Sequence, residues 1–344
     1  MSGTSLDGLD IALCEFEGSG QSLAYKILKV DTIPYSTAQK NKLRSLPYLN
    51  VENYFKLNHI FGKFIAKEVT KFLKDSPQRP DAIASHGHTV FHQPKIGFST
   101  QIGCGATIAA HTNITTVCDF RSMDVALGGQ GAPLVPVGDE LLFGKYKSCL
   151  NIGGIANISF RKNNSRVAFD ICIANMALNH FSQLAGSDYD KDGNWARQGH
   201  LNDKLFSELN ALDFFKTKGV RSIGREWFES EFLHTIEKNK LPVNDVLNTL
   251  VNHIAFQIAQ VLNENQLENV LITGGGAHNS FLIDALKKYY SGKIIIPDDV
   301  TINFKEALIF ALLGYLRLNN EVNTLSSVTG AKHDSVGGAI YYAK

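Results

Sequence analysis

The sequence predicts an α/β fold in which helices cover mixed β-sheets. Two observations predict this class. Short apolar segments bounded by polar or glycine residues recur along the chain, and longer segments of helical periodicity lie between them. A third observation concerns size, because 344 residues of 44% hydrophobic composition are enough for about two compact domains with a sizeable core.

Eight segments are expected to form strands because each is short, apolar or β-branched, and bounded by polar residues or glycine. In chain order they are residues 11–16, 24–30, 82–85, 115–118, 149–152, 167–169, 270–273 and 293–296. Four longer segments are expected to form helices because apolar residues recur at spacings of three and four. They are residues 51–73, 245–262, 277–290 and 305–318. The alternation of the two kinds of segment places the chain in the α/β class.

Residues 121–136 contain three glycines and two prolines and lack a clear periodicity, so a domain boundary is expected there. Gly128, Gly129 and Gly131 have either a functional or a structural explanation. They press against a ligand or act as a pivot between domains, or they form an ordinary surface turn. Their spacing alone favours neither explanation.

The charge balance argues against binding to nucleic acid or to a membrane. Thirty-four Lys plus Arg against 33 Asp plus Glu leave a formal net charge of +1, which attracts polyanions only weakly. The longest apolar run, residues 307–316, is shorter than the roughly 18 residues of a membrane span. No charged and apolar leader opens the chain, and its five cysteines never form a CxxC pair. We therefore expect a cytoplasmic protein with reduced thiols.

Three glycine-containing turns are candidates for phosphate binding, because each adjoins an apolar strand and has small residues whose backbone N–H groups can face an anion. The first turn consists of Ser2, Gly3, Thr4, Ser5, Leu6 and Asp7. The second contains Gly153 and Gly154, and the third contains Gly274, Gly275 and Gly276. In the first turn, Asp7 has a carboxylate that can hold a hydrated Mg²⁺.

Each of these turns, taken alone, is more often a simple tight turn than a phosphate site. The sequence contains no GxxxxGK[ST] motif, and no GxGxxG follows a strand with an acidic residue about twenty positions later. P-loop and Rossmann sites are therefore disfavoured. Three such turns far apart in the chain fit a nucleotide held in a cleft between two lobes.

Two metal-like patterns are not interpreted as metal sites. Residues 188–193 copy the first half of an EF-hand loop, but Gly199 stands where a bidentate Glu is required. His86, His88 and His92 lack a Cys or acidic residue at zinc-finger spacing, so we expect hydrogen-bonded histidines in a cleft.

Eleven stretches of the sequence carry a family resemblance. They are MSGTSLDGLD, ASHGHTVFHQP, STQIG, VCDFRSMDVALGGQGAPLVP, NIGGIANIS, AFDICIAN, DGNWARQG, GREWF, TGGGAHN, KEALIFALLGYL and SVTGA. By their number and order the chain resembles the anhydro-N-acetylmuramic acid kinases, a family of the actin and sugar-kinase superfamily, over essentially its whole length.

The resemblance implies a two-lobed, actin-like (ribonuclease H-like) ATPase fold with a nucleotide cleft between the lobes. The N-terminal lobe would comprise residues 1–125 and 322–344, and the C-terminal lobe residues 126–321. The implied reaction uses ATP and Mg²⁺. Water opens the anhydro bridge of 1,6-anhydro-N-acetylmuramic acid and O6 is phosphorylated, which gives N-acetylmuramic acid 6-phosphate and ADP during peptidoglycan recycling. A homodimer is also implied.

The resemblance assigns site residues as well. Asp170 matches the family's catalytic base, although an Asp at a strand end is, without that context, more often the N-cap of the following helix. Glu306 resembles the sugar-contacting glutamate, with a first-turn residue favoured by the helix dipole as its alternative. Arg121 and Asp124 match the substrate-binding DFRxxD stretch, and a structural ion pair between them is an equal alternative.

The sequence departs from the family pattern in three places. Members have a full strand before the SGTS turn, whereas this sequence begins inside the motif, so either the true start lies upstream or that strand is missing and ATP binding is weakened. DICIAN stands in place of DTGPGN around Asp170, and RSIG in place of KSTG at residues 221–224. These departures leave two alternatives open: a nucleotide-binding homologue without turnover, and a kinase of another sugar.

Overall fold

The computed structural model describes residues 1–3, 6–76, 78–217 and 221–343. Its contacts divide the chain into two compact units. Unit 1 is Met1–Phe143 together with Phe304–Lys344, and unit 2 is Gly144–Asn303. The expected lobes were residues 1–125 with 322–344 and residues 126–321, and this division stays a prediction.

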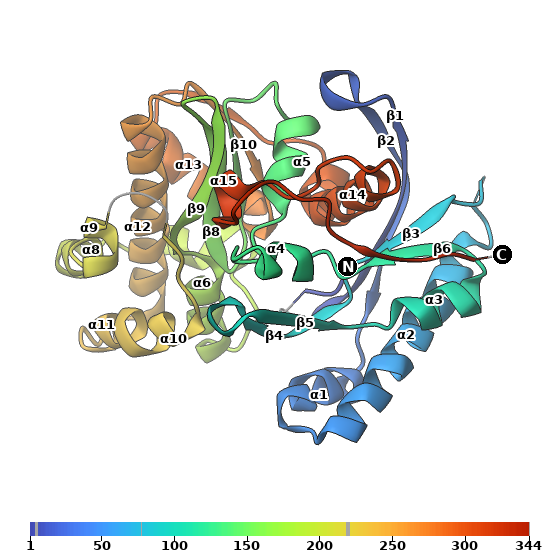
Figure 1. Cartoon of the computed structure of the whole chain (residues 1–344). Coiled ribbons are helices and arrows are strands. Elements are labelled where there is room, and N and C mark those ends of the chain that lie inside the picture. The colour runs from blue at the N-terminus through green and yellow to red at the C-terminus, as the bar shows by residue number, and fades with distance from the viewer. Residues whose placement is uncertain (4–5, 77, 218–220, 344) are drawn as a thin grey trace. The chain divides into compact units, whose positions relative to one another are not determined.

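Unit 1 contains three small groups of strands (Figure 1). A long antiparallel hairpin is formed by β1 (Gly8–Glu17) and β2 (Ala24–Pro34). A three-stranded sheet has the order β12-β6-β3 and consists of Ala339–Tyr341, Thr115–Cys118 and Ala82–Ser85. A second hairpin is formed by β4 (His88–Gln93) and β5 (Phe98–Ile102).

The helices of unit 1 differ widely in length. They are α1 (Thr37–Ser45), α2 (Val51–Leu73), α3 (Gly105–Thr112), α4 (Ser122–Ala126), α5 (Val135–Leu141), α15 (Ser326–Thr329) and most of α14 (Asp299–Leu318). α2 turns one apolar face inward, with Phe61, Ile65, Val69 and Phe72 buried and its lysines on another face. This helix therefore supplies one wall of the unit's core.

Unit 2 is built on one five-stranded mixed sheet of order β11-β10-β7-β8-β9. The strands in that order are Lys293–Ile295, Asn269–Thr273, Ser148–Ile152, Ile155–Lys162 and Ser165–Ile173. β10 runs parallel to both β11 and β7, whereas β7, β8 and β9 form an antiparallel meander. The carboxyl ends of β7 and β10 consequently lie side by side.

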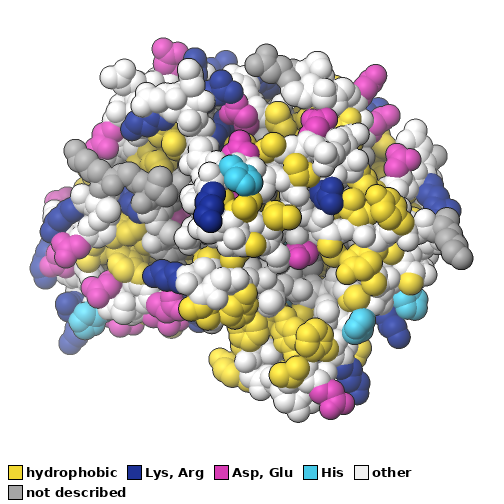
Figure 2. Space-filling model, in the orientation of Figure 1, with side chains coloured by type: hydrophobic (Ala, Val, Ile, Leu, Met, Phe, Trp, Pro, Cys, Tyr) yellow, Lys and Arg dark blue, Asp and Glu magenta, His cyan; other side chains and the backbone are white. Residues whose placement is uncertain are grey.

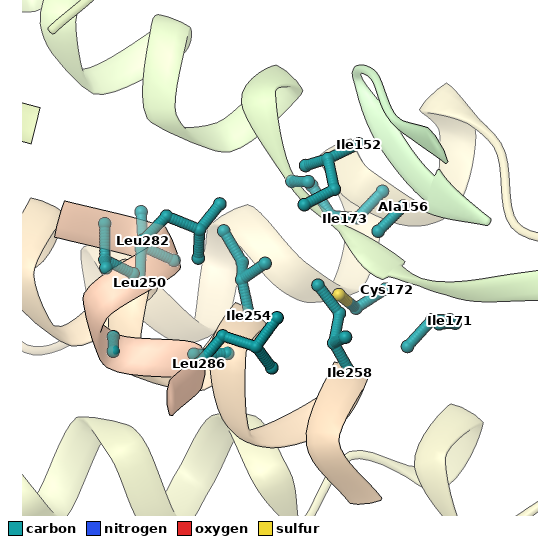
Figure 3. Close-up of a cluster of buried hydrophobic side chains, with 14 of the residues drawn as sticks. Ile152, Ala156, Ile171, Cys172, Ile173, Leu250, Ile254, Ile258, Leu282 and Leu286 are labelled. Atoms are coloured by element: carbon teal, nitrogen blue, oxygen red, sulfur yellow. The ribbon is translucent and has the colours of Figure 1, made fainter. Parts of the chain in front are cut away.

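The helices of unit 2 surround a central long helix, α12 (Val243–Glu264). The others are α6 (Asn175–Leu184), α7 (Asn194–Gln198), α8 (Asp203–Asn210), α9 (Asp213–Lys216), α10 (Arg225–Trp227), α11 (Leu233–Glu237) and α13 (Ser280–Tyr289). Figure 3 shows Leu250, Ile254 and Ile258 of α12 near apolar side chains of β9 and α13. Because neighbours pack on several sides of α12, 15 of its 22 residues are buried.

The structure confirms the α/β class and all eight expected strands. The four expected helices are also confirmed: α2 has its expected bounds, and the other three start at other residues than expected. α14 begins at Asp299, and α13 begins at Ser280 because the residues before it form a 3₁₀ turn, Gly275–His278. Asn279 then caps α13, its side chain accepting a hydrogen bond from Leu282 N at 3.0 Å. Residues 121–136, expected to be irregular, contain α4 and the start of α5.

Four strands were not expected: β4, β5, β8 and the three-residue β12. In the part of the chain that the structure describes, no helix is long and apolar enough to span a membrane.

Candidate active site

The second and third glycine turns lie side by side in unit 2. Asn151 of β7 pairs with Thr273 of β10, so the turns that follow these residues leave the sheet at the same edge. Gly274 has a φ of +81°, and a Cβ there would lie 2.6 Å from Asn151 Oδ1. Only glycine therefore allows the two turns to approach this closely.

The second turn, Gly153 and Gly154, also caps a helix. It connects β7 to β8, and its carbonyl groups accept hydrogen bonds from the first residues of α6: Asn175 N donates to Gly153 O at 3.1 Å, and Met176 N to Gly154 O at 3.1 Å. The side chain of Asn175 donates to Ile152 O at 3.1 Å, close to the third turn. The amide side chains of Asn151 and Asn175 thus lie between the two turns. Neither residue was expected from the sequence to belong to the site.

The first turn belongs to unit 1, and Thr4 and Ser5 lie outside the described residues. Ser2 is buried; its hydroxyl accepts a hydrogen bond from Tyr35 Oη at 2.8 Å and lies 3.1 Å from His88 Nδ1. Leu6 is buried with a φ of +61°, and its N–H donates to Gly3 O at 3.2 Å. Asp7 is exposed. Of the first turn's described side chains, Asp7 is therefore the one open to a ligand.

Asp170 does not end a strand, contrary to expectation. It lies inside β9, where a bulge leaves Ile171 without a partner: Asp170 pairs with Asn157 and Cys172 with Ala156. The expected strand, residues 167–169, was too short because its apolar run was taken to end at Asp170. The apolar run resumes after this charged residue, at residues 171–173. Bulges commonly redirect a side chain next to a functional site.

The carboxylate of Asp170 is held on one side only. Oδ2 accepts hydrogen bonds from Ser222 Oγ at 3.1 Å and from Ile223 N at 3.0 Å. Oδ1 has no hydrogen-bond partner among the described residues. The alternative role as N-cap of α6 is wrong, because Ala174 is the N-cap and the helix's first amides bind Gly153 and Gly154.

Arg221 clamps the backbone around Asp170. Its Nε donates to Asp170 O at 3.1 Å and its Nη2 to Ile171 O at 3.3 Å, while Asp170 N donates to Arg221 O at 2.9 Å. The guanidinium also lies over the ring of Phe214, 4.6 Å from its centroid. The RSIG segment thus holds both the backbone of Asp170, through Arg221, and its carboxylate, through Ser222 and Ile223. This role was not expected from the sequence.

The environment of Asp170 makes it a stronger base than a free aspartate. Burial raises the pKa of the carboxyl group, and the hydrogen bonds from Ile223 and Ser222 oppose this rise. A carboxylate with one free oxygen and a raised pKa can accept a proton from a water molecule.

Arg121 and Glu306 belong to unit 1 and interact through their charges. Burial lowers the pKa of Arg121 to about 10 and the charge of Glu306 opposes this, so the guanidinium stays protonated at neutral pH. Glu306 in α14 reaches solvent. The partial loss of water around its carboxyl group raises the pKa of that group, and the charge of Arg121 opposes this rise. One cation and one carboxylate are therefore available to polar groups of a ligand.

His86 orients Arg121. Nη2 and Nε of Arg121 lie 2.9 and 3.2 Å from His86 Nε2, and Nη1 donates to Gly131 O at 2.6 Å. Arg121 can only donate, so Nε2 of His86 accepts and its Nδ1–H donates to Gly87 O at 3.1 Å. Burial lowers the pKa of His86 to about 3, which keeps this neutral tautomer.

The glycines at 128, 129 and 131 fold around the buried carboxylate of Asp124. Gly131 N donates to its Oδ2 at 2.7 Å and Thr329 Oγ1 to its Oδ1 at 2.6 Å. A side chain at Gly129 would collide with the same carboxylate. These contacts describe a structural role for Asp124, and its expected contact to substrate stays a prediction.

Side chains of the two metal-like patterns form hydrogen bonds with other groups of the protein. Asp190 accepts hydrogen bonds from Trp195 N and Ala196 N, both at 2.9 Å, and Asp192 from Ser280 N at 2.8 Å. His92 Nδ1 lies 3.1 Å from Ser99 Oγ. Within the described ranges no group of three His, Cys, Asp or Glu side chains is arranged to hold a metal ion.

Comparison with known proteins gives long matches to one family. A family model described as "Anhydro-N-acetylmuramic acid kinase" matches residues 1–343. The curated protein of that name from Francisella tularensis subsp. novicida (strain U112) is 36% identical over 376 aligned positions, which cover 99% of this chain and 97% of the relative. The one from Aliivibrio fischeri (strain ATCC 700601 / ES114) is 36% identical over 364 positions, covering 100% and 98%.

Similarity to solved structures is weaker. A ROK family glucokinase from Streptomyces griseus, in complex with glucose and AMPPNP, has a TM-score of 0.36 at 9% identity and covers 83% of this chain and 94% of its own. The ROK hexokinase from Thermus thermophilus has a TM-score of 0.37 at 10% identity, covering 89% and 100%.

Proposed function

Because the chain belongs to the anhydro-N-acetylmuramic acid kinase family, we propose that it hydrolyses the 1,6-anhydro bridge of 1,6-anhydro-N-acetylmuramic acid and transfers the γ-phosphoryl group of ATP to O6. The products are N-acetylmuramic acid 6-phosphate and ADP. The observation that supports this most is Asp170, a half-buried carboxylate of raised pKa with one oxygen held and one free.

Asp170 is the proposed catalytic base. Its Oδ1 takes a proton from the water whose oxygen attacks the anomeric carbon, while Ser222 and Ile223 hold Oδ2. As the bond from the anomeric carbon to O6 breaks, O6 attacks the γ-phosphorus and ADP leaves. Fixing one oxygen of the carboxylate orients the other, which favours a single direction of proton transfer.

The three glycine turns are the proposed ATP site, with the backbone amides of the first turn and of residues 153–154 and 274–276 near phosphate or ribose. Mg²⁺ would bind mainly to ATP oxygens and water, with Asp7 as a protein ligand. The single exposed carboxylate of Asp7 fits this mode, since Mg²⁺ in kinases needs few protein ligands. Bound there, the cation would neutralise phosphate charge.

Arg121 and Glu306 are the proposed sugar contacts. A guanidinium that stays charged suits the lactyl carboxylate of the substrate, and a carboxylate accepts hydrogen bonds from sugar hydroxyls. His86 keeps Arg121 in place. Asp124 is proposed to act on the substrate through the glycine loop that it holds together.

The cellular setting is proposed on the same basis: cytoplasmic peptidoglycan recycling by a homodimer. Support for the dimer comes from exposed apolar side chains around the start of α2, Tyr48, Val51 and Phe55. Figure 2 shows hydrophobic side chains gathered at the end of the molecule that carries α1 and the start of α2. The names of the relatives do not favour the alternatives, a kinase of another sugar or a protein without turnover.

A substrate panel tests the proposal. ADP release is measured with ATP, Mg²⁺ and either 1,6-anhydro-N-acetylmuramic acid, N-acetylmannosamine or glucose. We expect release that depends on the anhydro sugar and a phosphorylated product at O6. Equal or greater release with either other sugar would reject the substrate assignment, and ATP binding without release would support the non-catalytic alternative.

A further inference from the structure

Two cysteines of unit 1, Cys104 and Cys118, lie close together at the start of α3. Cys118 is the last residue of β6, and Cys104 is the N-cap of α3, which packs against β6 (Figure 1). A Cβ at Gly105, the first residue of α3, would lie 2.5 Å from Cys118 Sγ. The sulfur of Cys118 is therefore in contact with the residue that directly follows Cys104.

The electrostatics of this region also show that the two thiols are neighbours. Burial raises the pKa of Cys118 to about 11, and the charges of Asp119 and Cys104 add to this rise, whereas a hydrogen bond with the Gly105 backbone opposes it. Burial and then the charges of Cys118 and Cys104 also raise the pKa of Tyr341. Because such charge effects fall off over a few ångströms, the two thiols and Tyr341 form one cluster.

A cavity of about 250 Å³ gives small molecules access to the cluster, and both Cys104 and Cys118 line it together with His86. Each of these two cysteines is partly exposed, whereas Cys149 and Cys172 in unit 2 are buried. A small oxidant can therefore reach this pair. When one thiol of such a pair is oxidised, the neighbouring thiol can trap the product as a disulfide.

We propose that Cys104 and Cys118 are a modification site at which hydrogen peroxide forms a disulfide bond between them. Cys104 reacts first, because a helix N-terminus favours negative charge and the thiolate is the form that attacks. Its sulfur attacks one peroxide oxygen and the O–O bond breaks, which leaves sulfenic acid at Cys104 and a hydroxide that takes up the proton Cys104 had lost.

The second step closes the disulfide. The sulfur of Cys118 attacks the sulfur of Cys104 as the S–O bond breaks, and the oxygen leaves as water with the proton of the Cys118 thiol. In sum, two thiols and one hydrogen peroxide give one disulfide and two water molecules. The two sulfurs lose the two electrons that the peroxide gains.

The backbone around Cys104 is fixed against α2, so the disulfide would move Cys118. Gly103 N donates to Asn58 Oδ1 at 2.7 Å, and Cys104 N donates to Asn58 O at 3.3 Å. A Cβ at Gly62 of α2 would lie 3.0 Å from Cys104 O, so the helix and this segment are in close contact. Cys118, at the end of a strand, has fewer such restraints on the residues that follow it.

Movement of Cys118 would reach Arg121, the proposed sugar contact. Cys118 pairs with Ser85 of β3, and His86 and Arg121, which follow these two strands, are in contact. A shift of Cys118 relative to Ser85 therefore moves Arg121 relative to His86. We expect the disulfide to weaken sugar binding in this way. This effect rests on the proposed function, whereas formation of the disulfide does not.

Peptide mapping of the full chain tests the modification. The reduced protein is treated with hydrogen peroxide, remaining thiols are blocked with N-ethylmaleimide, and a digest is analysed by mass spectrometry without reductant. We expect one main linked peptide, which joins Cys104 to Cys118 and disappears with dithiothreitol. Absence of this link, or links from Cys14 to either residue in comparable amount, would overturn the proposal.

Three serine variants test the order of the two steps. In Cys118→Ser, Cys104 should be oxidised further to sulfinic acid, because the thiol that traps the sulfenic acid is gone. In Cys104→Ser, Cys118 should stay reduced. Cys14→Ser is the matched control, a partly exposed cysteine outside the cluster, and should form the link as the wild type does. Oxidation of Cys118 in the absence of Cys104 would overturn the proposed order. The wild-type map decides the link even where a variant does not fold.

Kinetics of the oxidised and the reduced protein test the effect on sugar binding. We expect the KM for 1,6-anhydro-N-acetylmuramic acid to rise at least about fivefold on oxidation, to return with dithiothreitol, and not to change in Cys118→Ser. An unchanged KM in fully linked protein would overturn this effect. If the reduced protein does not act on the anhydro sugar, the proposed function fails, and the peptide map still decides whether the disulfide forms.

Discussion

At the scale of single residues, the site depends on pairs in which one side chain holds another. Ser222 holds one oxygen of Asp170, and His86 holds the guanidinium of Arg121. The proposed site residues were assigned from the sequence through the family resemblance. The residues that orient them could not be identified in this way. Ser222 lies 52 positions from Asp170 in the chain, and His86 lies 35 positions from Arg121, so only the fold brings each pair into contact.

Replacing Ser222 by alanine should move the pH dependence of turnover. The Ser222 hydrogen bond favours the charged form of Asp170, so its loss raises the pKa of that carboxyl group further. The acidic limb of kcat against pH should then shift to higher pH, with a rate loss of about two- to tenfold on that limb that narrows as the pH rises above it. Ser187→Ala, far along the chain in an exposed turn, serves as the control. An unshifted limb would mean that Ser222 does not hold the base.

Replacing His86 by leucine should weaken sugar binding. The change removes the acceptor for Arg121 Nε and Nη2, so the guanidinium loses its fixed orientation. We expect KM for the sugar to rise about tenfold with a smaller effect on kcat, and His86→Gln to restore most of the loss because its amide oxygen accepts the same bonds. If the leucine and glutamine variants behave alike, His86 has no orienting role.

At the scale of elements, the second and third glycine turns pack closely together and form part of the proposed nucleotide site. The parallel pairing of β7 with β10 brings the turns together, and the antiparallel meander brings β9 with Asp170 into the same sheet. Gly274 and Gly275 differ in what surrounds them. A Cβ at Gly274 meets Asn151 and Ile152, whereas one at Gly275 meets nothing nearer than Asn175 Nδ2 at 3.6 Å.

This difference predicts opposite outcomes for two substitutions. Gly275→Val should leave Tm nearly unchanged, because the folded protein has room for the side chain, and should raise the Kd for ATP at least about tenfold by holding the nucleotide away. Gly274→Ala should lower Tm by several degrees, since its φ of +81° and its contacts oppose a side chain. Calorimetry and nucleotide titration measure both. ATP affinity unchanged in Gly275→Val would exclude the third turn from the ATP site.

Most elements followed from local sequence pattern, and the exceptions have physical reasons. α2 matches its expected range residue for residue, because one apolar face runs through all its turns. β4, with His88, His92 and Gln93, is too polar for the apolar-run criterion, and β12 is too short. The bulge in β9 depends on pairing with β8, and pairing between strands is not visible in the local pattern of either.

At the scale of the whole molecule, buried neutral histidines make stability depend on pH. Burial lowers the pKa of His253 in α12 to about 3, and its Nε2 has no hydrogen-bond partner among the described residues. The unfolded chain binds a proton at this residue near pH 6.5, and the folded protein does not until about pH 3. Its contribution to stability is therefore lost as the pH falls from 6.5 toward 3.

His253→Gln should make the protein less sensitive to acid. Glutamine can keep the hydrogen bond to Asn210 Oδ1 that His253 Nδ1 makes at 2.8 Å, but it does not titrate. Between pH 8 and pH 5 the wild-type free energy of unfolding should fall by about 2 kcal/mol more than that of the variant. Denaturant unfolding at both pH values measures the difference. Parallel losses in the two proteins would show that His253 is protonated in the folded state.

The central claim is that Asp170 removes the proton from the attacking water in an ATP-dependent reaction of the anhydro sugar. The most direct measurement compares ADP release and ATP affinity in the wild-type protein and in Asp170→Asn. We predict that ADP release falls by about 10²- to 10⁴-fold while the Kd for ATP stays nearly the same, because only the transition state needs the base. Release by the variant at close to the wild-type rate would contradict the account.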